Sequence, residues 1–311
     1  MTRRTDADAT GRVEPIGGRW RPRDMTIRGV LRPAVAAALL LGLASCGEGG
    51  ITGEAPPAPV SWEPAATDGL VLRAEFTGGF VSPSATAGRL PLISVYANGR
   101  VLTEGPVAAI YPGPALPNVQ EQHIVRAAVQ ELVDRAMAAG VAETSDLGTP
   151  PVADAPSTRF TLVTAAHTYV REVTALRETP PEGNGLTADQ QAARKKLSEF
   201  LTLLQGPAEG AASVPYQPSA VAAMVTPWVD PQDGLPQPEV AWPGPALPGE
   251  PTGGLPDVTC VTATGDQAQA LVAAAGSANA ATPWVTADGA RWSVTFRPLL
   301  PDESSCADLQ D

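Results

Sequence analysis

Proline and glycine are so dense in this chain that they limit the length of every helix and strand. The 311 residues include 33 Pro and 30 Gly, and both residue types interrupt regular structure. They are most concentrated in residues 206–256, which contain 12 Pro and 7 Gly. We therefore expect short elements joined by long loops, with a Pro/Gly-rich linker at 206–256 between two folded parts.

The composition excludes several classes of protein. With 43% hydrophobic residues the chain is too apolar to be wholly disordered, and its apolar runs are too short for a multi-span membrane protein. A formal net charge of −12 argues against nucleic acid as a partner, because phosphate binding needs a basic patch. The 19 Arg against 2 Lys, with abundant Ala, Pro and Gly, are typical of a high-GC bacterial genome.

An uncharged run of 13 residues, 33–45, follows the basic residues Arg28 and Arg32. Its length fits the apolar part of a secretory signal and falls short of the ~20 residues that a membrane-spanning helix needs. The run ends in Leu43-Ala44-Ser45-Cys46, and a Gly-rich stretch follows. The alternative is a short core helix that ends in Cys by chance, but the basic flank, the length and the small residues all favour a signal peptide.

The segment from Met25 to Cys46 resembles the lipobox region of bacterial lipoproteins, in which an apolar residue and two small residues precede a Cys. The resemblance implies a diacylglyceryl group on the Cys46 thiol and cleavage between Ser45 and Cys46. The general layout is also similar to uncharacterised surface lipoproteins of high-GC Gram-positive bacteria. It implies a palmitate-type anchor on the outer face of the cytoplasmic membrane, where each buried CH₂ contributes about 0.8 kcal/mol.

The lipobox resemblance sets the expected organisation of the first 67 residues. Residues 1–45 are expected to be an upstream extension, with Met25 as initiator, followed by the signal peptide. Residues 46–67 are expected to be a tether because they are rich in Pro and Gly. The chain from Cys46 onward has a net charge of −16, which repels anionic headgroups, so the lipid must provide the anchoring.

Residues 68–205 are predicted to form an α+β domain, a mostly antiparallel sheet with two helices packed on it. Alternating apolar residues predict a strand over 70–77, and Asn98-Gly99 predicts a hairpin between 92–96 and 100–103. Further strands are expected at 107–111, 160–163 and 169–176. Helices are expected from Asn118, as N-cap, to Ala139, and from Thr187, where Gln190 completes a capping box, to 205.

Residues 257–311 are predicted to form a small βαββ unit. Its elements are expected at 258–264, 266–275, 284–287 and 291–297, with Asp288-Gly289 as the last turn. Cys260 and Cys306 are the only Cys besides Cys46, and outside the cytoplasm they are expected to form a disulfide. A metal site is the alternative, but two thiols without a neighbouring His make a poor ligand set.

Two features of the 206–256 segment leave questions open. Residues 221–226 are compatible with a strand packed on the first domain. Tyr111-Pro-Gly-Pro-Ala-Leu-Pro117 recurs almost unchanged as Trp242-Pro-Gly-Pro-Ala-Leu-Pro248. The repeat reflects either a duplication or biased composition, and the sequences around the two copies do not align.

The sequence offers no clear catalytic motif. His123 is expected to be solvated beside a helix, and His167, near Ser157 and Asp154 in sequence, permits a Ser/His/Asp set on paper without the nucleophile elbow that would support it. No phosphate-binding Gly loop or complete calcium loop occurs, so neither a cofactor nor a metal is expected. Arg194-Lys195-Lys196, the one basic run, is expected on the solvated face of the second helix.

Tryptophan provides the remaining candidate binding residues, which are Trp228, Trp242, Trp284 and Trp292. Exposed Trp rings stack on sugars or anchor protein partners, whereas buried Trp is ordinary core, and the second reading is favoured. The leading hypothesis is a non-enzymatic lipoprotein that binds an envelope protein or wall component. The alternative is a cell-wall hydrolase with scattered carboxylates or an unrecognised Ser/His site.

Overall fold

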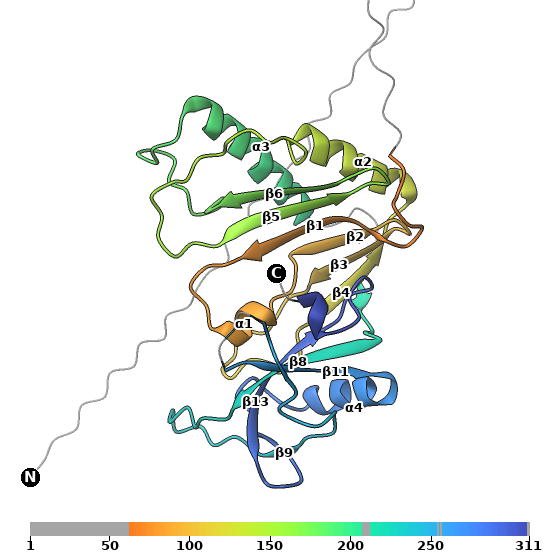
Figure 1. The fold of residues 1–311 in the computed structure, drawn as a ribbon, viewed down its shortest axis with the longest axis vertical. Coiled ribbons are helices and arrows are strands. Elements are labelled where there is room, and N and C mark those ends of the chain that lie inside the picture. The colour runs from red at the N-terminus through yellow and green to blue at the C-terminus, as the bar shows by residue number, and fades with distance from the viewer. Residues whose placement is uncertain (1–61, 207–211, 254, 256, 310–311) are drawn as a thin grey trace, which may run out of the picture. The chain divides into compact units, whose positions relative to one another are not determined.

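The computed structural model describes residues 62–206, 212–253, 255 and 257–309. The expected signal peptide, the cleavage site at Ser45 and the lipidation site at Cys46 lie outside these residues. The described residues belong to one compact unit. It is α+β, with two largely antiparallel sheets and few helices, as the sequence predicts (Figure 1).

The first sheet has seven strands in the order β6-β5-β1-β2-β3-β4-β7, and every neighbouring pair is antiparallel. Its strands are β1 (Leu70–Thr77), β2 (Ile93–Tyr96), β3 (Arg100–Glu104), β4 (Val119–His123), β5 (Ser157–Val163), β6 (Thr168–Thr174) and β7 (Val214–Pro215). All four residues of the central strand β2 are buried. Both faces of this sheet are therefore covered at β2.

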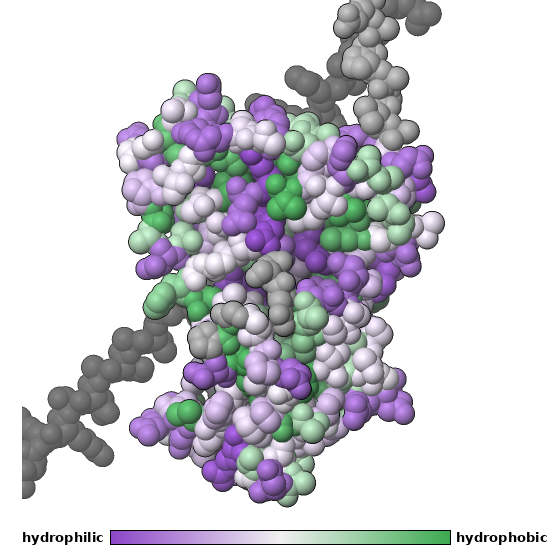
Figure 2. Space-filling view, viewed as in Figure 1, coloured by the Kyte–Doolittle hydropathy of each residue, from purple (hydrophilic) through white to green (hydrophobic). Residues whose placement is uncertain are grey.

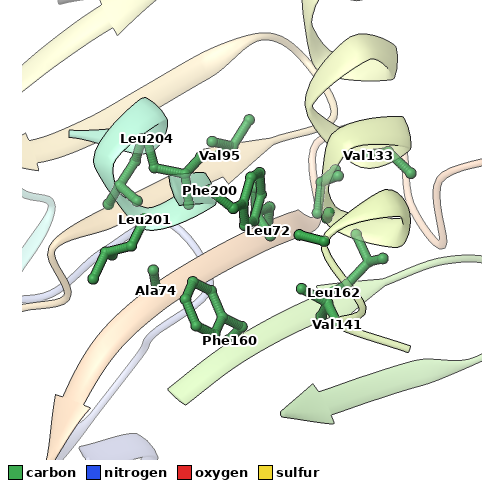
Figure 3. Close-up of a cluster of buried hydrophobic side chains, with 14 of the residues drawn as sticks. Leu72, Ala74, Val95, Val133, Val141, Phe160, Leu162, Phe200, Leu201 and Leu204 are labelled. Atoms are coloured by element: carbon green, nitrogen blue, oxygen red, sulfur yellow. The ribbon is translucent and has the colours of Figure 1, made fainter. Parts of the chain in front are cut away.

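Two helices cover one face of the first sheet, namely α2 (Arg126–Ala138) and α3 (Ala188–Leu204) (Figure 1). Leu72, Val95 and Leu162 from the strands meet Val133 of α2 and Phe200 of α3 in a single core (Figure 3). The Phe160 and Phe200 rings lie 5.9 Å apart. On α3, Leu197, Phe200, Leu201 and Leu204 are buried and form the helix face that packs on the sheet.

The second sheet has six strands in the order β10-β11-β8-β13-β12-β9, and only the β12–β9 pair is parallel. Its strands are β8 (Ala220–Pro227), β9 (Val240–Ala241), β10 (Glu250–Pro251), β11 (Thr259–Thr264), β12 (Trp284–Val285) and β13 (Arg291–Pro298). Two further helices, α1 (Pro83–Ala87) and α4 (Gly265–Ala275), and the 3-10 turn Cys306–Leu309 complete the fold.

The predicted βαββ elements of the C-terminal piece are present, but they share their sheet with a strand from the Pro/Gly-rich segment. Strand β8 lies between β11 and β13 and pairs with both. The strand expected at 221–226 is thus confirmed. It pairs within the second sheet, and its residues Ala222 and Met224 also pack against Ala87 of α1, which belongs to the 68–205 segment. Six consecutive residues of β8 are buried, which suits a central strand with both faces covered. The domain boundaries drawn from the sequence stay a prediction.

The helix predicted from Asn118 to Ala139 begins later than expected. Residues 119–123 form β4, which pairs with β3 in the register Arg100↔His123 to Glu104↔Val119. Helix α2 starts at Arg126 with Val125 as its N-cap, and Asn118 Nδ2 instead donates to the carbonyl of Pro106 at 2.8 Å. Strand pairing across the hairpin outweighs the local capping signal here. The capping box predicted at Thr187 and Gln190 is confirmed.

Two further local expectations differ from the structure. Residues 107–111 form no strand, and Val107, Ile110 and Tyr111 are exposed. The hairpin at Asn98-Gly99 is confirmed, but only Gly99 has a positive φ, of 88°. Asn98 instead uses its side chain, whose Oδ1 accepts from the Arg100 backbone N–H at 3.1 Å.

Candidate functional sites

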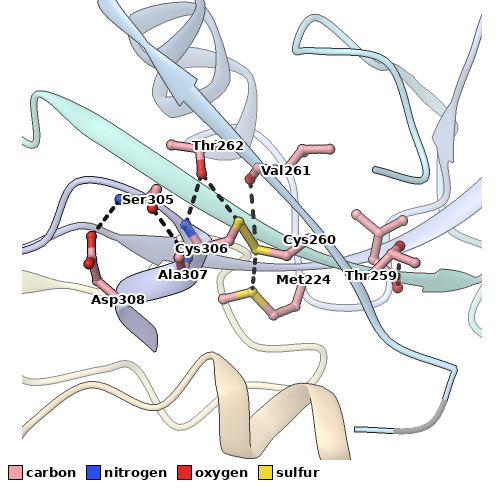
Figure 4. The surroundings of a disulfide bond; sticks show 10 residues. Met224, Thr259, Cys260, Val261, Thr262, Ser305, Cys306, Ala307 and Asp308 are labelled. Atoms are coloured by element: carbon pink, nitrogen blue, oxygen red, sulfur yellow. Dashed lines mark hydrogen bonds between the residues drawn. A yellow bond between two sulfur atoms is a disulfide. The ribbon is translucent and has the colours of Figure 1, made fainter. Parts of the chain in front are cut away.

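The disulfide between Cys260 and Cys306 is present and joins β11 to the last turn of the described chain (Figure 4). Cys260 is buried among the side chains of Met224, Val258 and Leu299. Thr262 supports the other half of the bridge, because its hydroxyl lies 3.2 Å from Cys306 Sγ and accepts from the Cys306 backbone N–H at 3.0 Å. The bridge closes a separation of 46 residues.

The four C-terminal Trp residues do not form an exposed aromatic face. Trp284 is buried, and Trp242 and Trp292 are half-buried against the same core. The Trp284 ring lies 5.7 Å from that of Trp242 and 5.3 Å from that of Phe296. Trp228 is half-buried and its ring stacks under the Arg291 guanidinium at 5.7 Å. The rings of Trp242, Trp284 and Trp292 thus fill the second core, and Trp228 lies outside it.

The structure does not bring Ser157, His167 and Asp154 together. Ser157 begins β5, whereas His167 lies in the turn after it, at the far end of the strand. A strand of seven residues spans roughly 20 Å. The Ser157 hydroxyl bonds instead to Thr174 Oγ1 at 3.3 Å. His123 lies on β4, not on the predicted helix, and its Nε2 is 3.0 Å from Glu121 Oε1. Its side chain is exposed, as expected.

A polar cleft of about 530 Å³ lies where the first sheet meets the end of the second. Its walls carry the four arginines Arg73, Arg89, Arg159 and Arg297 and the four acids Glu75, Glu172, Glu303 and Asp308. In the face drawn in Figure 2, hydrophilic and apolar residues are mixed over both parts of the fold. The formal charges of these eight residues cancel, so the cleft is polar without a net charge.

A partly buried network of charges links the two sheets beside this cleft. Arg73 Nη2 lies 2.9 Å from Asp302 Oδ1 and 3.0 Å from Oδ2, and Tyr96 donates its hydroxyl to Asp302 Oδ1 at 2.6 Å. Arg73 Nε donates to Ser94 Oγ at 3.0 Å. Arg73, Ser94 and Tyr96 belong to the first sheet, whereas Asp302 follows the last strand of the second. The network thus fixes the C-terminal segment against β1 and β2.

A second pair extends the network. Arg297 Nη2 lies 2.9 Å from Glu303 Oε1, and these side chains are only 3% and 5% exposed. Arg297 also donates to the carbonyl of Arg89 at 3.2 Å and to that of Pro298 at 2.6 Å. Glu303 Oε2 accepts from the Leu300 backbone N–H at 2.8 Å. Both buried charges are therefore paired and hydrogen-bonded, as burial requires.

Burial and the neighbouring carboxylates act in opposite directions on the pKa values of the two arginines in this network. Burial lowers the pKa of Arg297 more than Glu303 raises it, yet a guanidinium keeps its charge in proteins. Burial also lowers the pKa of Arg73, but the carboxylates of Asp302 and Glu303 raise it by more, so that its pKa is raised overall. Burial, followed by the Asp302 carboxylate, raises the pKa of Tyr96 far above its ordinary value of 10.0. Tyr96 is thus a fixed hydrogen-bond donor.

A second hollow differs in character. This apolar groove, of about 450 Å³, is lined by Trp62, Glu63, Val133, Asp134, Met137, Thr164, Ala165, Ala166 and Tyr169. Its floor is the buried side chains of Trp62 and Val133, and its mouth includes Met137, whose side chain is 45% exposed. Trp62, in the segment expected to be a tether, packs into the first core. The groove thus lies where the described chain begins.

The backbone around the groove is fixed by hydrogen bonds. Trp62 donates from its indole to the carbonyl of Val163 at 3.3 Å, and its backbone N–H donates to Gln130 Oε1 at 3.1 Å. Ala165 N–H donates to the carbonyl of Glu63 at 2.9 Å. The entering chain, helix α2 and the β5–β6 turn are therefore held together, and the groove is a formed feature of the fold.

Both copies of the repeated Pro-rich sequence pack against the second core. Ala115 and Leu116 from the first copy and Trp242 and Leu247 from the second contact it. The copies differ in backbone, because the first has a cis peptide bond at Tyr111-Pro112 and the second at Leu247-Pro248. Both copies of the repeat therefore cover the second hydrophobic core.

Neither hollow was predicted from the sequence. Arg73 and Asp302 are 229 residues apart, and no local pattern predicts such a contact. The one available signal was that Arg73 is a charged residue in the middle of a strand expected from alternating apolar residues. For the groove, the signal was Trp62, a single large aromatic residue within a stretch expected to be a spacer.

Comparisons with known proteins give no relative. No protein-family model matches the chain, and neither a curated protein nor a solved structure matches it. Within the described ranges, no group of three or more His, Cys, Asp or Glu side chains is placed to hold a metal ion. Over the same ranges, no helix has the length and apolarity that crossing a membrane requires.

Proposed function

We propose that this chain is an extracytoplasmic lipoprotein held on the outer face of the cytoplasmic membrane through acyl chains on Cys46. Its folded part is proposed to act as a non-enzymatic binding module for an envelope protein or wall component. The lipobox-like sequence ending at Cys46 is the basis of the location. The observation that carries the proposal is the Cys260–Cys306 disulfide, because disulfides persist in oxidising compartments and are rare in the cytosol.

The nature of the folded part supports a binding role. Its two sheets are connected by a paired charge network, which favours one fixed arrangement of the surfaces on both sheets. The histidines and Ser157, the groups that the sequence offers for nucleophilic catalysis, lie apart on the first sheet. Fixed, preorganised surfaces favour binding because less conformational entropy is lost on association.

Metabolic labelling with a palmitate analogue tests the location. The full chain should become labelled and enter the detergent phase after phase partition, and a Cys46→Ser variant should remain unlabelled and aqueous. Ser45→Gly keeps a small residue before the Cys and serves as the matched control, which should stay labelled. If wild type and Cys46→Ser behave alike in both assays, the proposed anchor is wrong.

The binding role needs a separate experiment on intact cells. A membrane-impermeant crosslinker should join the labelled lipoprotein to an envelope protein or a wall fragment, and mass spectrometry should identify the joined peptide. Crosslinks should fall on residues of the described fold. Recovery of the chain alone, with no crosslinked envelope component at any crosslinker length, would count against a binding module.

A further inference from the structure

The apolar groove beside Trp62 has no role in the network that joins the two sheets. Its polar rim is limited to Glu63, Asp134 and Thr164, and its other lining residues are apolar or aromatic. Concave, mostly apolar pockets of this size are typical of sites for small apolar ligands. A floor formed by the Trp62 ring, with the half-buried Tyr169 ring beside it, suits a ligand with an apolar tail and a polar head.

The position of the groove in the chain indicates where such a ligand comes from. Trp62 forms part of the floor and follows Cys46 by 16 residues. A fully extended chain of that length spans at most roughly 55 Å. If Cys46 carries acyl chains, the groove stays within that distance of the membrane surface. The ligand source nearest to it is then the acyl chains of the membrane lipids.

The charges around the groove restrict the headgroup. Glu63 and Asp134 are exposed carboxylates at its rim. Gln130 Nε2 donates to Asp134 Oδ1 at 2.8 Å, which fixes that carboxylate beside the mouth. No basic side chain is among the described lining residues. Like charges repel, so this rim disfavours a fatty acid anion or an anionic phospholipid and accepts an uncharged headgroup.

From these observations we infer that the groove formed by Trp62, Val133, Met137, Ala165, Ala166 and Tyr169 binds one acyl chain of a neutral membrane lipid. The inference rests on the proposed anchor for the source of the lipid, whereas the binding itself depends only on the groove. The acyl chain lies on the Trp62 and Val133 side chains, and its uncharged head lies at the rim near Glu63 and Asp134. Met137 covers the chain at the mouth.

Tryptophan quenching by a brominated lipid tests the groove without the anchor. The full chain with Cys46→Ser and Trp20→Phe, in which Trp62 is the one indole outside the second part of the fold, is titrated with dibromostearoyl glycerol. This neutral monoacylglycerol carries bromines that quench an indole only at close range. Trp62 should be quenched with a saturable, one-to-one dependence on the lipid. Trp228, Trp242, Trp284 and Trp292 belong to the second part of the fold and should supply unquenched emission. Trp62→Phe should remove the quenched fraction.

Two exposed neighbours on α2 provide a matched pair of variants. Met137→Lys places an ammonium at the mouth and should raise the half-saturating lipid concentration by about tenfold or more, because a charge disfavours an apolar site. Ala138→Lys adds the same charge at the next residue, which is exposed and does not line the groove, and should change that concentration less than about twofold. Near-ultraviolet circular dichroism checks that both variants fold as wild type.

Specific outcomes would overturn the inference. Absence of saturable quenching, or equal effects of Met137→Lys and Ala138→Lys, would show that the groove does not hold the acyl chain. Equal or tighter binding of the dibromostearate anion would refute the neutral headgroup. Because all these variants carry Cys46→Ser, their results do not depend on lipidation. Failure of the anchor appears only in palmitate labelling.

Discussion

Arg73 on β1 holds Asp302, a residue 229 positions later, with a single Nη2 that lies within 3.0 Å of both carboxylate oxygens. The same carboxylate accepts the hydroxyl of the fully buried Tyr96. The side chains of Arg73 and Asp302 are 13% and 24% exposed. This contact is the central link between the first sheet and the C-terminal segment.

Removing one partner of this pair should destabilise the fold more than removing a surface pair. Asp302→Asn should lower the free energy of unfolding by about 2 kcal/mol, because hydrogen bonds to charged groups contribute about 1.5–3 kcal/mol. Glu131→Gln breaks the exposed pair with Arg135 and should cost less than about 0.5 kcal/mol. Urea unfolding measures the free energy of unfolding of both variants. Equal losses in the two would show that the Arg73–Asp302 contact contributes no more to stability than an exposed ion pair.

The disulfide should protect both cysteines and stabilise the fold. In a Cys46→Ser chain, an alkylating reagent should label neither Cys260 nor Cys306 until reductant is added. Replacing both by Ala should lower the free energy of unfolding by about 4 kcal/mol in the chain-entropy account of a loop of this length. Stoichiometric labelling of the native chain without reductant would contradict the bridge.

Gly99 should tolerate no side chain. It has φ of +88°, and a Cβ there would lie 2.2 Å from the carbonyl oxygen of Ile124. Gly289 has a similar φ of +85° but open space around it. Gly289→Ala should therefore cost only the backbone strain, about 1–2 kcal/mol. Gly99→Ala should cost clearly more in thermal or urea unfolding, and equal costs would mean that the carbonyl moves away freely.

Glu121 should make stability depend on pH in the acid range. Its carboxylate accepts from Arg100 Nε at 2.8 Å and Nη2 at 3.0 Å, and these hydrogen bonds, with His123 beside them, lower its pKa below the ordinary 4.5. Because the folded-state pKa is the lower one, this stabilisation is complete above about pH 4.5 and is lost as the pH falls through the folded-state value.

Urea unfolding at several pH values between 7 and 3 tests this sign. Glu121→Gln should flatten the decline in stability below pH 4.5, and Arg100→Gln should flatten it to a similar extent. The double variant should add little further change, because both single variants remove the same interaction. If the free energy of unfolding of Glu121→Gln fell as steeply below pH 4.5 as that of wild type, other carboxylates would be responsible for the loss of stability in acid.

Local sequence patterns predicted the structure correctly where it depends only on neighbouring residues in the chain. The capping box at Thr187 and Gln190 and the turn at Gly99 need only a few neighbouring residues, and both are present. Asn118 carried a good local signal for a helix start, but β3 offered residues 119–123 a full antiparallel partner. A short sequence window contains no information about that distant partner.

The same limit explains why the candidate sites were harder to predict. Cys260 and Cys306 were predictable as a pair because no other Cys remains once Cys46 is set aside. Arg73 and Asp302 had many possible partners, and only the packing of both sheets selects one. The groove at Trp62 depends on where the entering chain crosses α2 and the β5–β6 turn, which no spacing of residues shows.

Strand β8 also determines how this protein can be divided for study. It lies between β11 and β13 and pairs with both. Its register with β11 runs from Thr259↔Val225 to Thr264↔Ala220, and its register with β13 runs from Trp292↔Pro227 to Pro298↔Val221. A fragment that begins after Pro227 would lack β8. The backbone N–H and C=O groups of β11 and β13 that pair with β8 would then be unpaired, and such edges promote aggregation with other chains. The stretch richest in Pro and Gly is therefore the part that a truncation must keep.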